Sequence, residues 1–390
     1  MIPLIKNTFY NETETKKALS DFILNAQKLS MGDKCLEFEE KFAEFQGRKY
    51  AILFNSGSSA NLALIQALKN LGLLKNNDKV GFSALTWSTN IMPIIQLGLK
   101  AVPVDCDKTT LNVASKILID TVDKQDIKAF FITNALGFAG DLDNIKHMCA
   151  QRGIILIEDN CESLGSELPA GKTGNFGLAS TFSFYVAHHI STIEGGMVCT
   201  DRDDIAQMLR IVRANGWDRN LIPSQKAHLR RKHSITNEFD AKYIFYDLGY
   251  NLRPTEITGF LGSHQIKYID KVVAAREKNY LELEAITKQN PDLMVVDHAH
   301  MSKISNFSYP VICKDAALRK KYMNKCEHAG VEIRPVIAGN IQKQPFYRKY
   351  IKEKYYLEGS EFLHNCGFYF GNYPELTEED MDVLKTCLMQ

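Results

Sequence analysis

Apolar and polar positions follow a helical rhythm in the first part of the chain. Residues 12–28 repeat with helical periodicity and keep a polar face, and residues 34–47 form a stronger amphipathic pattern that Gly47 ends. The apolar side chains expected on one side of the second helix are Leu36, Phe38, Phe42 and Phe45. Two amphipathic helices are therefore predicted before the first strand.

Short apolar runs then alternate with further helical segments. The predicted strands cover residues 50–55, 78–85, 100–107, 127–137 and 153–160, with helices at 56–68 and 141–152 between them. This alternation predicts a mostly parallel sheet covered by helices on both faces. Because ligands bind at the carboxyl ends of such strands, we expect Asn55, Asp105 and Asp159 to face one crevice.

The pattern changes near residue 250, where longer helices and shorter strands begin. We therefore expect a large α/β domain over residues 1–250, with an N-terminal helical segment, and a smaller C-terminal α+β domain over residues 251–390. A chain of 390 residues that is 45% hydrophobic is long enough for two or three domains with a sizeable core.

Charge and hydropathy restrict the partners. The formal net charge is +1, so no overall field attracts nucleic acid or an anionic membrane. No apolar run approaches the ~18 residues of a membrane span, and the start of the chain is polar by residue 11 without an apolar signal core. We expect a cytoplasmic protein that binds neither nucleic acid nor membrane.

The nine cysteines are scattered, and none forms a CxC or CxxC pair or a Cys/His cluster with zinc spacing. They are predicted to be reduced and mostly buried, and no metal site is expected. The absence of a close pair also weighs against an iron–sulfur cluster, although ligands from distant segments leave that alternative open.

The segment SGSSANL, residues 56–62, is the first candidate for ligand binding. A strand that ends in small residues and opens a helix presents free backbone N–H groups and a positive dipole end to a phosphate. Gly57 permits close backbone approach, and Ser58 and Ser59 add hydroxyl donors. The alternative is an ordinary serine N-cap, which this segment taken alone favours.

Three further candidates lie at the same edge of the predicted sheet. Asp159 ends a buried strand, where an unpaired carboxylate is costly, so it is suited to a cationic ring N–H; Glu162 follows three residues later. The alternative is a helix N-cap at Asp159 with a solvated Glu162. Trp87 follows the second strand and is placed to stack on a ring, although a lone tryptophan more often packs in the core.

The segment SFYVAHHISTIEGG, residues 183–196, adds Ser183 as a phosphate donor and His188 as a candidate base. It contains no lysine. A lone histidine is more often structural, but two adjacent ones downstream of the segments above favour a functional role.

Taken together, the chain resembles the DegT/StrS family of sugar aminotransferases and dehydratases, which are fold-type I enzymes dependent on pyridoxal phosphate (PLP). The motifs are SGSSANL, the TWS turn, IEDNCESLGS, SFYVAHH with EGG, RANGWDRNL, LGYNLRPTEITG and VEIRPVIAGN. The resemblance implies a fold-type I aminotransferase-like architecture. It also implies cofactor contacts from Gly57, Ser58, Trp87, Asp159, Glu162 and Ser183, and from Asn251 in the neighbouring subunit of a homodimer with shared active sites.

Most members of the family carry a lysine where this chain has His188. The histidine version resembles the sugar 3-dehydratases of the family. This implies PLP or its amino form PMP held non-covalently, His188 as base, and L-glutamate as amino donor. The implied substrate is a nucleotide-linked 4-keto-6-deoxysugar, similar to GDP-4-keto-6-deoxymannose. It loses its C3 hydroxyl, with release of ammonia, on a route to surface-glycan deoxysugars.

Three arginines, Arg219, Arg253 and Arg334, are candidates for binding the amino-acid carboxylates or the sugar pyrophosphate, because a planar guanidinium fits both. The basic stretch 225–233 could contact the diphosphate, although a solvated loop is the commoner interpretation. Three other functions remain open: an aminotransferase that uses a different lysine such as Lys172, an iron–sulfur-dependent reductive 3-dehydrase, and a non-catalytic protein of the same fold.

Overall fold

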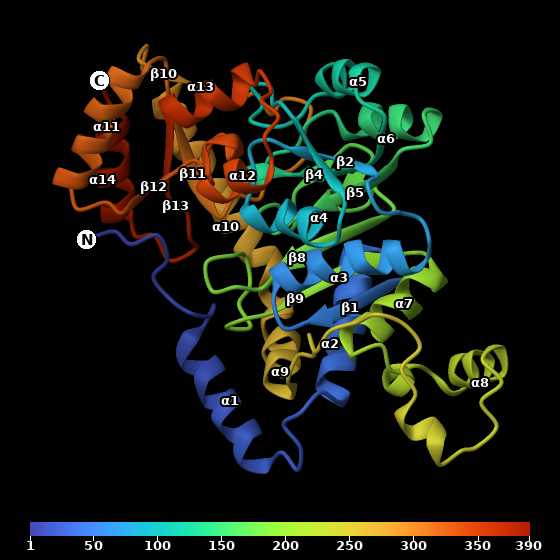
Figure 1. The fold of residues 1–390 in the computed structure, drawn as a ribbon. Coiled ribbons are helices and arrows are strands. Elements are labelled where there is room, and N and C mark those ends of the chain that lie inside the picture. Colours follow the sequence, from blue (N-terminus) through green and yellow to red (C-terminus); the bar gives the residue numbers. More distant parts are fainter.

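A seven-stranded sheet forms the centre of the computed structural model, which describes residues 1–390 (Figure 1). Its strand order is β1-β9-β8-β5-β4-β2-β3. The strands are β1 Tyr50–Phe54, β2 Lys79–Ser83, β3 Lys100–Val104, β4 Ile127–Thr133, β5 Ile155–Asp159, β8 Ala179–Ser183 and β9 Gly196–Thr200. All five strands predicted from the apolar runs are confirmed.

Only β9 runs against the others, because it pairs antiparallel with both of its neighbours, β8 and β1. The remaining strands share one direction, so the carboxyl ends of β1, β5 and β8 lie at the same edge of the sheet. The prediction of a mostly parallel sheet is confirmed, and this edge is where the predicted ligand-binding segments meet.

Helices cover both faces of this sheet, as predicted. The helices of this body are α1 Glu12–Asn25, α2 Asp33–Gln46, α3 Gly57–Asn70, α4 Met92–Gln96, α5 Ser115–Lys124, α6 Leu142–Gln151, α7 Asp203–Arg213, α8 Pro223–Lys232 and α9 Glu256–Gln265. Two of them do not lie on the sheet: α1 packs against α9, and α8 packs against the end of α7. Alternate strand residues explain the two faces: Ile52 packs with the α3 and α7 side, whereas Leu53 packs with α2.

The predicted second helix is confirmed with one correction. α2 ends at Gly47, which has the left-handed φ of 74° that a helix C-terminus requires. Phe38 and Phe42 are fully buried, but Leu36 is 47% exposed. The reason is the helical angle: two residues turn the helix by about 200°, so Leu36 and Phe38 cannot share one face.

The C-terminal part contains a smaller antiparallel sheet in the order β10-β11-β13-β12. Its strands are β10 Leu293–Met294, β11 Ser308–Cys313, β12 Ile333–Pro335 and β13 Gly367–Gly371. Its helices are α10 Ile269–Thr287, α11 Ala316–His328, α12 Pro345–Tyr350, α13 Glu358–Cys366 and α14 Glu378–Leu388. A short hairpin of β6 Glu167–Leu168 and β7 Gly171–Lys172 belongs to neither sheet.

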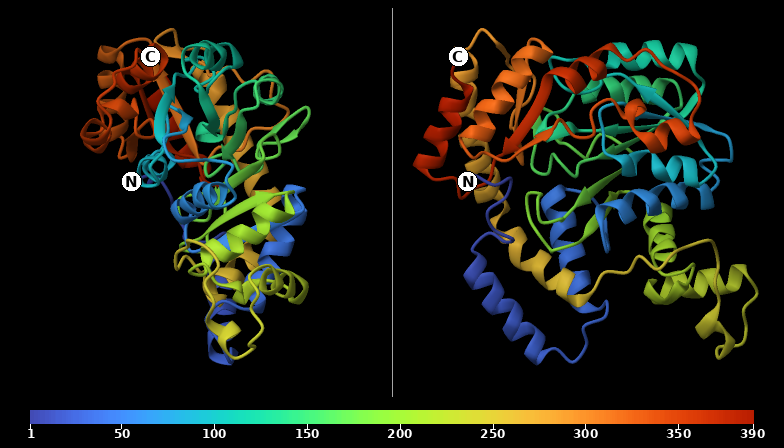
Figure 2. Two further views of the ribbon diagram at one scale, coloured as in Figure 1. Left: turned by 45° about the vertical axis from the view of Figure 1, so that its right-hand side comes forward. Right: turned by 60° about the vertical axis from the view of Figure 1, so that its left-hand side comes forward.

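One long helix belongs to both bodies, and the N-terminal segment of the chain packs on the small body. α10 begins in the core of the large body, through Ile269 and Val273, and ends in the core of the small one, through Tyr280 and Leu283. The N-terminus crosses to the small body, where Ile2 pairs with Val331. Both turned views in Figure 2 show the two chain ends on this side of the molecule.

Two expectations about strand ends and loops need correction. Asp105, after β3, does not face the crevice; its carboxylate accepts hydrogen bonds from the backbone N–H groups of Gly359 and Ser360 at the start of α13, both at 2.8 Å. β3 is three strands from β5, about 14 Å at normal strand spacing. The basic stretch 225–233 is not a loop but most of helix α8, which projects beyond α7 in Figure 1.

The cysteines behave as predicted: all nine are free thiols and eight are buried, with Cys161 partly exposed. No group of three or more His, Cys, Asp or Glu side chains is placed to hold a metal ion. None of the helices has both the length and the apolar character that crossing a membrane requires.

Candidate active site

A cavity of about 370 Å³ opens at the carboxyl ends of β1, β5 and β8, between the two bodies. Seven residues predicted from the sequence line it: Gly57, Ser58, Trp87, Asp159, Glu162, Ser183 and His188. The small body closes the cavity with Phe307, Ile337 and Tyr369. The fold thus gathers residues spread over more than 130 positions of the large body at one site.

The start of α3 and the end of β8 form one wall of this cavity. Ser56 caps α3 by accepting a hydrogen bond from the N–H of Ser59 at 3.1 Å, as the serine N-cap alternative predicted. The cap leaves the first N–H groups of the helix beside the cavity. A Cβ at Gly57 would lie 2.7 Å from the Ser183 Cβ, so only glycine allows this approach. The wall combines a cap with the geometry of an anion-binding helix end.

Asp159 is 4% exposed at the end of β5 and has no ion-pair partner. Its Oδ2 accepts hydrogen bonds from the side-chain amides of Asn61 at 3.1 Å and Asn90 at 2.7 Å, and its Oδ1 from the N–H of Cys161 at 2.9 Å. No helix begins after it, so the helix N-cap alternative is wrong. The carboxylate is held rigidly and keeps acceptor capacity for a cation in the cavity.

Sequence reasoning missed the two asparagines that hold Asp159. Asn61 follows Gly57 by four residues on α3, so helical spacing alone places it on the same face, and that signal was available. Asn90 ends a three-residue 3-10 helix, Ser88–Asn90, which is too short for a hydrophobic period to show the direction of its side chains. Each amide bond to the carboxylate contributes about 1.5–3 kcal/mol at most, which is typical of hydrogen bonds to charged groups.

Glu162 lies beside Asp159 and accepts a hydrogen bond from the N–H of Leu136 at 2.7 Å. Burial, with a smaller contribution from the charge of Asp159, raises the pKa of Glu162 to about 8, against the lowering effect of that N–H bond. At neutral pH the side chain is therefore a carboxylic acid, which can donate a hydrogen bond into the cavity. A carboxyl group kept neutral at physiological pH is a recurring feature of acid–base sites.

The raised pKa of Glu162 predicts a pH-dependent stability. Its folded pKa of about 8 lies above the ordinary value of 4.5, so between these values the folded state binds more protons than the unfolded state. Stability contributed by this group therefore falls as pH rises through that window. We expect Glu162→Gln to gain stability over the parent chain between pH 5 and pH 8 in urea unfolding of the cofactor-free protein. If the free energy of unfolding changed with pH in the same way in both proteins, the raised pKa of Glu162 would be contradicted.

His188 lies in the loop after β8, with its ring between Tyr185 and Phe307 at centroid distances of 6.1 and 5.7 Å. Its Nδ1 is enclosed and has no hydrogen-bond partner. Burial lowers the pKa of His188 to about 4; the charge of Asp159 raises the value and that of Arg276 lowers it further. The ring is neutral at physiological pH and is free to accept a proton.

No lysine lines the cavity. Lys172, the alternative considered from the sequence, lies on β7, where its Nζ donates to the carbonyl of Phe45 and sits 3.9 Å from the centre of the Phe45 ring. Its amine is therefore committed to another part of the large body. Trp87 is 57% exposed at the cavity mouth, so its core-packing alternative is wrong.

Four predicted residues lie outside the cavity of their own chain. Asn251 is exposed and accepts a hydrogen bond from Nε of Arg253 at 3.0 Å. Arg219 is exposed and stacks over Trp217, with 5.1 Å from guanidinium to ring centre. Arg334 lies on β12 opposite Tyr369, which does line the cavity, and pairs with Glu332. Nothing in a single chain brings these four to the cavity interior.

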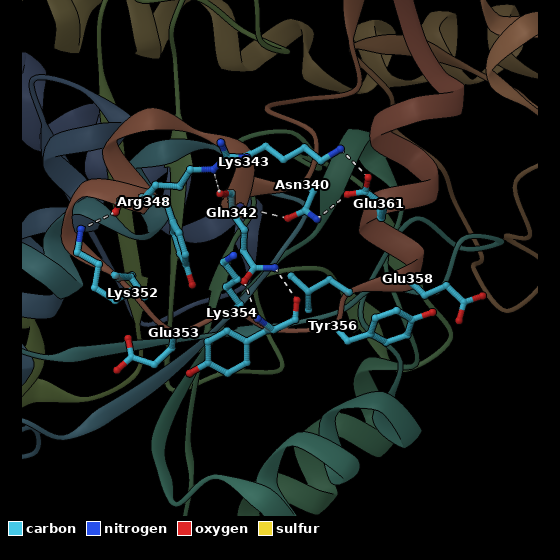
Figure 3. A pocket seen from close by; sticks show the side chains of 14 residues that line it. Asn340, Gln342, Lys343, Arg348, Lys352, Glu353, Lys354, Tyr356, Glu358 and Glu361 are labelled. Atoms are coloured by element: carbon cyan, nitrogen blue, oxygen red, sulfur yellow. Dashed lines mark hydrogen bonds and ion pairs between the residues drawn. The ribbon is translucent and has the colours of Figure 1, made fainter.

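A second cavity, of about 710 Å³, lies between α12, α13 and the segment that joins them (Figure 3). Figure 3 shows Lys343 and Asn340 pointing toward Glu361, which accepts from them at 2.5 and 3.1 Å. Gln342 binds the backbone of Tyr355 through both ends of its amide, at 2.9 Å each. None of the predicted site residues lines this cavity, and several of its polar groups already bind one another.

Comparison with known proteins gives a consistent result. The profile of the DegT/DnrJ/EryC1/StrS aminotransferase family matches residues 10–388. GDP-4-keto-6-deoxy-D-mannose 3-dehydratase of Escherichia coli O55:H7 is 33% identical over 395 aligned residues, covering 99% of each chain.

Two solved structures are similar over the full length of both chains. A GDP-4-keto-6-deoxymannose 3-dehydratase with a trapped PLP–glutamate geminal diamine superposes with a TM-score of 0.90 at 32% identity, covering 100% of each chain. A histidine-to-asparagine variant of that enzyme with bound GDP-perosamine gives the same TM-score, identity and coverage.

Proposed function

The chain belongs to the DegT/DnrJ/EryC1/StrS aminotransferase family, and from that premise we propose that it is a PLP-dependent 3-dehydratase of a nucleotide-linked 4-keto-6-deoxysugar. The substrate class is that of the 33% identical relative, GDP-4-keto-6-deoxy-D-mannose, and glutamate is the amino donor. One observation carries the proposal: an imidazole, and no lysine, lies among the residues that line the cavity.

The cavity residues fit the cofactor. The wall of Gly57, Ser58 and Ser183 offers backbone and hydroxyl donors for a phosphate. Asp159, buried and without an ion-pair partner, provides the anion that a pyridinium N–H requires. Trp87 provides a flat, exposed ring at the mouth, and Glu162 provides a neutral hydrogen-bond donor. These contacts hold the cofactor without a covalent bond.

A bound cofactor would supply the chemistry that the side chains lack: it would accept an amino group from glutamate and, in its amino form, pass the electron pair freed by proton loss towards C3 of the ketosugar, so that the C3 hydroxyl leaves. His188 supplies the proton transfer: its neutral ring accepts a proton from carbon at a ring nitrogen and carries it as imidazolium. Asp159, held in place by Asn61 and Asn90, would accept the N–H of the cofactor ring. Phe307 and Tyr369 exclude water from the histidine side of the cavity.

The absence of an amine at position 188 explains why dehydration is favoured over transamination. A lysine there would bond the cofactor covalently and compete with the sugar for it. Imidazole cannot form that bond, so His188 acts only as an acid and base. The sugar amine formed after loss of the hydroxyl is left to hydrolyse to a 3-deoxy-4-ketosugar and ammonia.

The decisive experiment is a product analysis. Purified protein with PLP, glutamate and GDP-4-keto-6-deoxy-D-mannose should give the 3-deoxy-4-ketosugar, ammonia and 2-oxoglutarate, without iron or an added reductant. Omitting glutamate should stop turnover unless PMP is supplied. A stable 4-aminosugar would instead identify an aminotransferase, and a requirement for iron and an electron donor would identify a reductive dehydrase. CDP- and dTDP-linked sugars in parallel assays test the choice of nucleotide.

We further propose a homodimer in which Asn251 and Arg253 complete the neighbour's site. Both lie outside the cavity of their own chain. The segment just before them carries large apolar side chains that are at least 60% exposed: Phe239, Tyr243, Phe245 and Leu248. Such a group of exposed apolar side chains is typical of a protein interface. Arg219 and Arg334 remain candidates for the carboxylate and pyrophosphate.

This arrangement predicts that Asn251→Trp weakens cofactor retention as much as Ser183→Ala does. The bulky side chain would occupy the partner's phosphate wall while leaving its own chain folded. Cofactor content after gel filtration, with the mass from light scattering, gives the measurement. A mixture of Asn251→Trp and His188→Asn subunits should regain activity, because each mixed dimer has one intact site. A monomer with full activity would contradict the proposal.

A further inference from the structure

Arg276 is a buried guanidinium without a carboxylate bonded to it. The side chain is 3% exposed in α10, and its Nε has no hydrogen-bond partner. The carboxylate whose charge stabilises it is that of Glu375, yet burial dominates and lowers the pKa of Arg276 to about 10. It stays protonated at neutral pH. A buried cation without a bonded anion is costly, and an apolar side chain would stabilise the fold as well or better.

The three hydrogen bonds of Arg276 go to backbone carbonyls of three different segments. Nη2 donates to the carbonyl of His188 at 3.3 Å, and Nη1 donates to Asn372 and, at 3.4 Å, to Asn306. The side chain of Asn372 returns a bond to the Arg276 carbonyl at 2.9 Å. One guanidinium therefore joins the loop of the candidate base to two segments of the small body.

The position of Arg276 along α10 explains this reach. The residues before it pack into the core of the large body, and those after it pack into the core of the small one. Arg276 thus lies where the helix crosses between the bodies. A narrow cavity of about 30 Å³ there is lined by Arg276, His188 and Glu375. Arg276 therefore holds the His188 loop on the side away from the active-site cavity, at the boundary between the two bodies.

Resting on the proposed function, we infer that Arg276 is a positioning residue: it fixes the backbone of His188 and places a permanent positive charge behind the imidazole. The charge adds to the effect of burial in keeping the ring neutral, and the two forked N–H groups fix the direction in which the ring faces the cavity. Misplacement of a proton-transfer group by about 1 Å costs on the order of 10²-fold in rate, so this fixation matters for turnover.

Other charged and titratable groups around the ring set the background for this effect. They are Asp159 at the end of β5, Cys161 and Glu162 after it, Tyr185, His189 and Glu194 in the loop itself, Tyr369 on β13, and Tyr10, Tyr373 and Glu375 on the side of Arg276. Asp159 raises the pKa of His188, whereas Arg276 lowers it. The charge of Arg276 therefore opposes the effect on the pKa of His188 of Asp159, the residue assigned to the cofactor ring.

Two substitutions separate the effect of the positive charge of Arg276 from the effect of its forked N–H donors. Arg276→Gln removes the charge and keeps a short donor, and Arg276→Lys keeps the charge and loses the fork. Asn279→Ala is the matched control: Asn279 lies one turn further along α10 and donates to the Tyr373 carbonyl at 3.1 Å, but makes no hydrogen bond to the His188 loop. All three proteins are measured without cofactor and then with it.

In the cofactor-free protein, the NMR titration midpoint of the His188 ring should rise in Arg276→Gln and stay near the parent value in Arg276→Lys. Amides of residues 185–192 should exchange hydrogen faster in both variants. With cofactor and ketosugar, kcat should fall on the order of 10- to 100-fold with little change in KM. Asn279→Ala should change none of these, although it also loses a bond to backbone.

An unchanged His188 midpoint together with unchanged loop exchange in folded Arg276→Gln would overturn the inference, as would the same changes in Asn279→Ala. If Arg276→Gln does not fold, loop exchange and kcat in Arg276→Lys decide the matter, and parent values for both would overturn it. Absence of dehydration by the parent chain would refute the proposed function alone, because the titration and exchange measurements need no turnover.

Discussion

Replacing His188 by asparagine is expected to lower dehydration on the order of 10²–10⁴-fold while leaving the fold and cofactor binding intact. The reason is that the donors and acceptors assigned to the cofactor, at Gly57, Ser183 and Asp159, lie on other elements. Formation of PMP from glutamate should slow as well, since that half-reaction also moves a proton at the cofactor. Rapid-quench product analysis and the cofactor absorbance spectrum provide the two measurements.

Borohydride distinguishes a base from an anchor. Reduction of the PLP-loaded parent chain should leave no cofactor attached to the protein, whereas His188→Lys should trap it covalently and form less 3-deoxysugar. Mass spectrometry of the intact chain reads both results. Cofactor trapped on the parent chain, or near-normal dehydration by His188→Asn, would show that another residue is the base.

His189→Asn is the matched control for these experiments. His189 is buried, its Nε2 contacts the Ser305 carbonyl at 3.0 Å, and it does not line the active-site cavity. Its replacement should lower stability, because a buried hydrogen bond changes, but the folded protein should dehydrate the sugar at close to the parent rate. Comparison of the His188 and His189 variants therefore tests the two adjacent histidines one at a time.

The second large effect is expected for Asp159→Asn, which should weaken cofactor binding and lower turnover on the order of 10²–10³-fold. The substitution removes the only charge that the fold aims at the ring nitrogen. In the cofactor-free protein the same change should also lower stability, because both carboxylate oxygens accept hydrogen bonds and the amide of asparagine would turn an NH2 group towards one set of these donors. The loss of cofactor affinity therefore has to be measured on the folded protein.

Asp105→Asn provides the comparison for this prediction. It is also an aspartate at the end of a parallel strand, but its carboxylate accepts two backbone N–H bonds at the start of α13. Its replacement should lower stability by about 1 kcal/mol, as loss of a helix cap does, and leave cofactor affinity unchanged. Equilibrium unfolding and cofactor titration of both variants check the contrast. Equal loss of cofactor affinity in the two proteins would contradict the assignment of Asp159.

Much of the candidate site could be read from local sequence. The carboxyl ends of β1, β5 and β8 carry Gly57, Asp159 and Ser183 directly after apolar runs, and parallel strands bring such ends to one edge. The lack of lysine at His188 is visible without any structure. The five predicted strands and both N-terminal helices were confirmed because each has a strong period of its own.

The wrong predictions concern residues whose surroundings depend on elements distant in the chain or on the exact angle around a helix. Asp105 and Asp159 both end parallel strands, but strand order puts β3 at the sheet edge and β5 near its middle. Leu36 is apolar yet exposed, because its helix angle and not its chemistry decides its direction. The basic stretch 225–233 is helical, although its charge suggested a solvated loop.

The sequence by itself determined the strands and the absence of a lysine at position 188, and it predicted an anion-binding start of α3, since each depends on residues close together in the chain. Only the tertiary structure decided which aspartate faces the cavity, that Asn61 and Asn90 hold it, and that Arg276 joins the loop of His188 to the small body. The hydrogen bonds to Asp159 and to the His188 carbonyl span 69 to 98 positions along the chain. The physical reason is that hydrophobic periodicity fixes the face of each element, whereas strand order and helix crossing fix which faces meet.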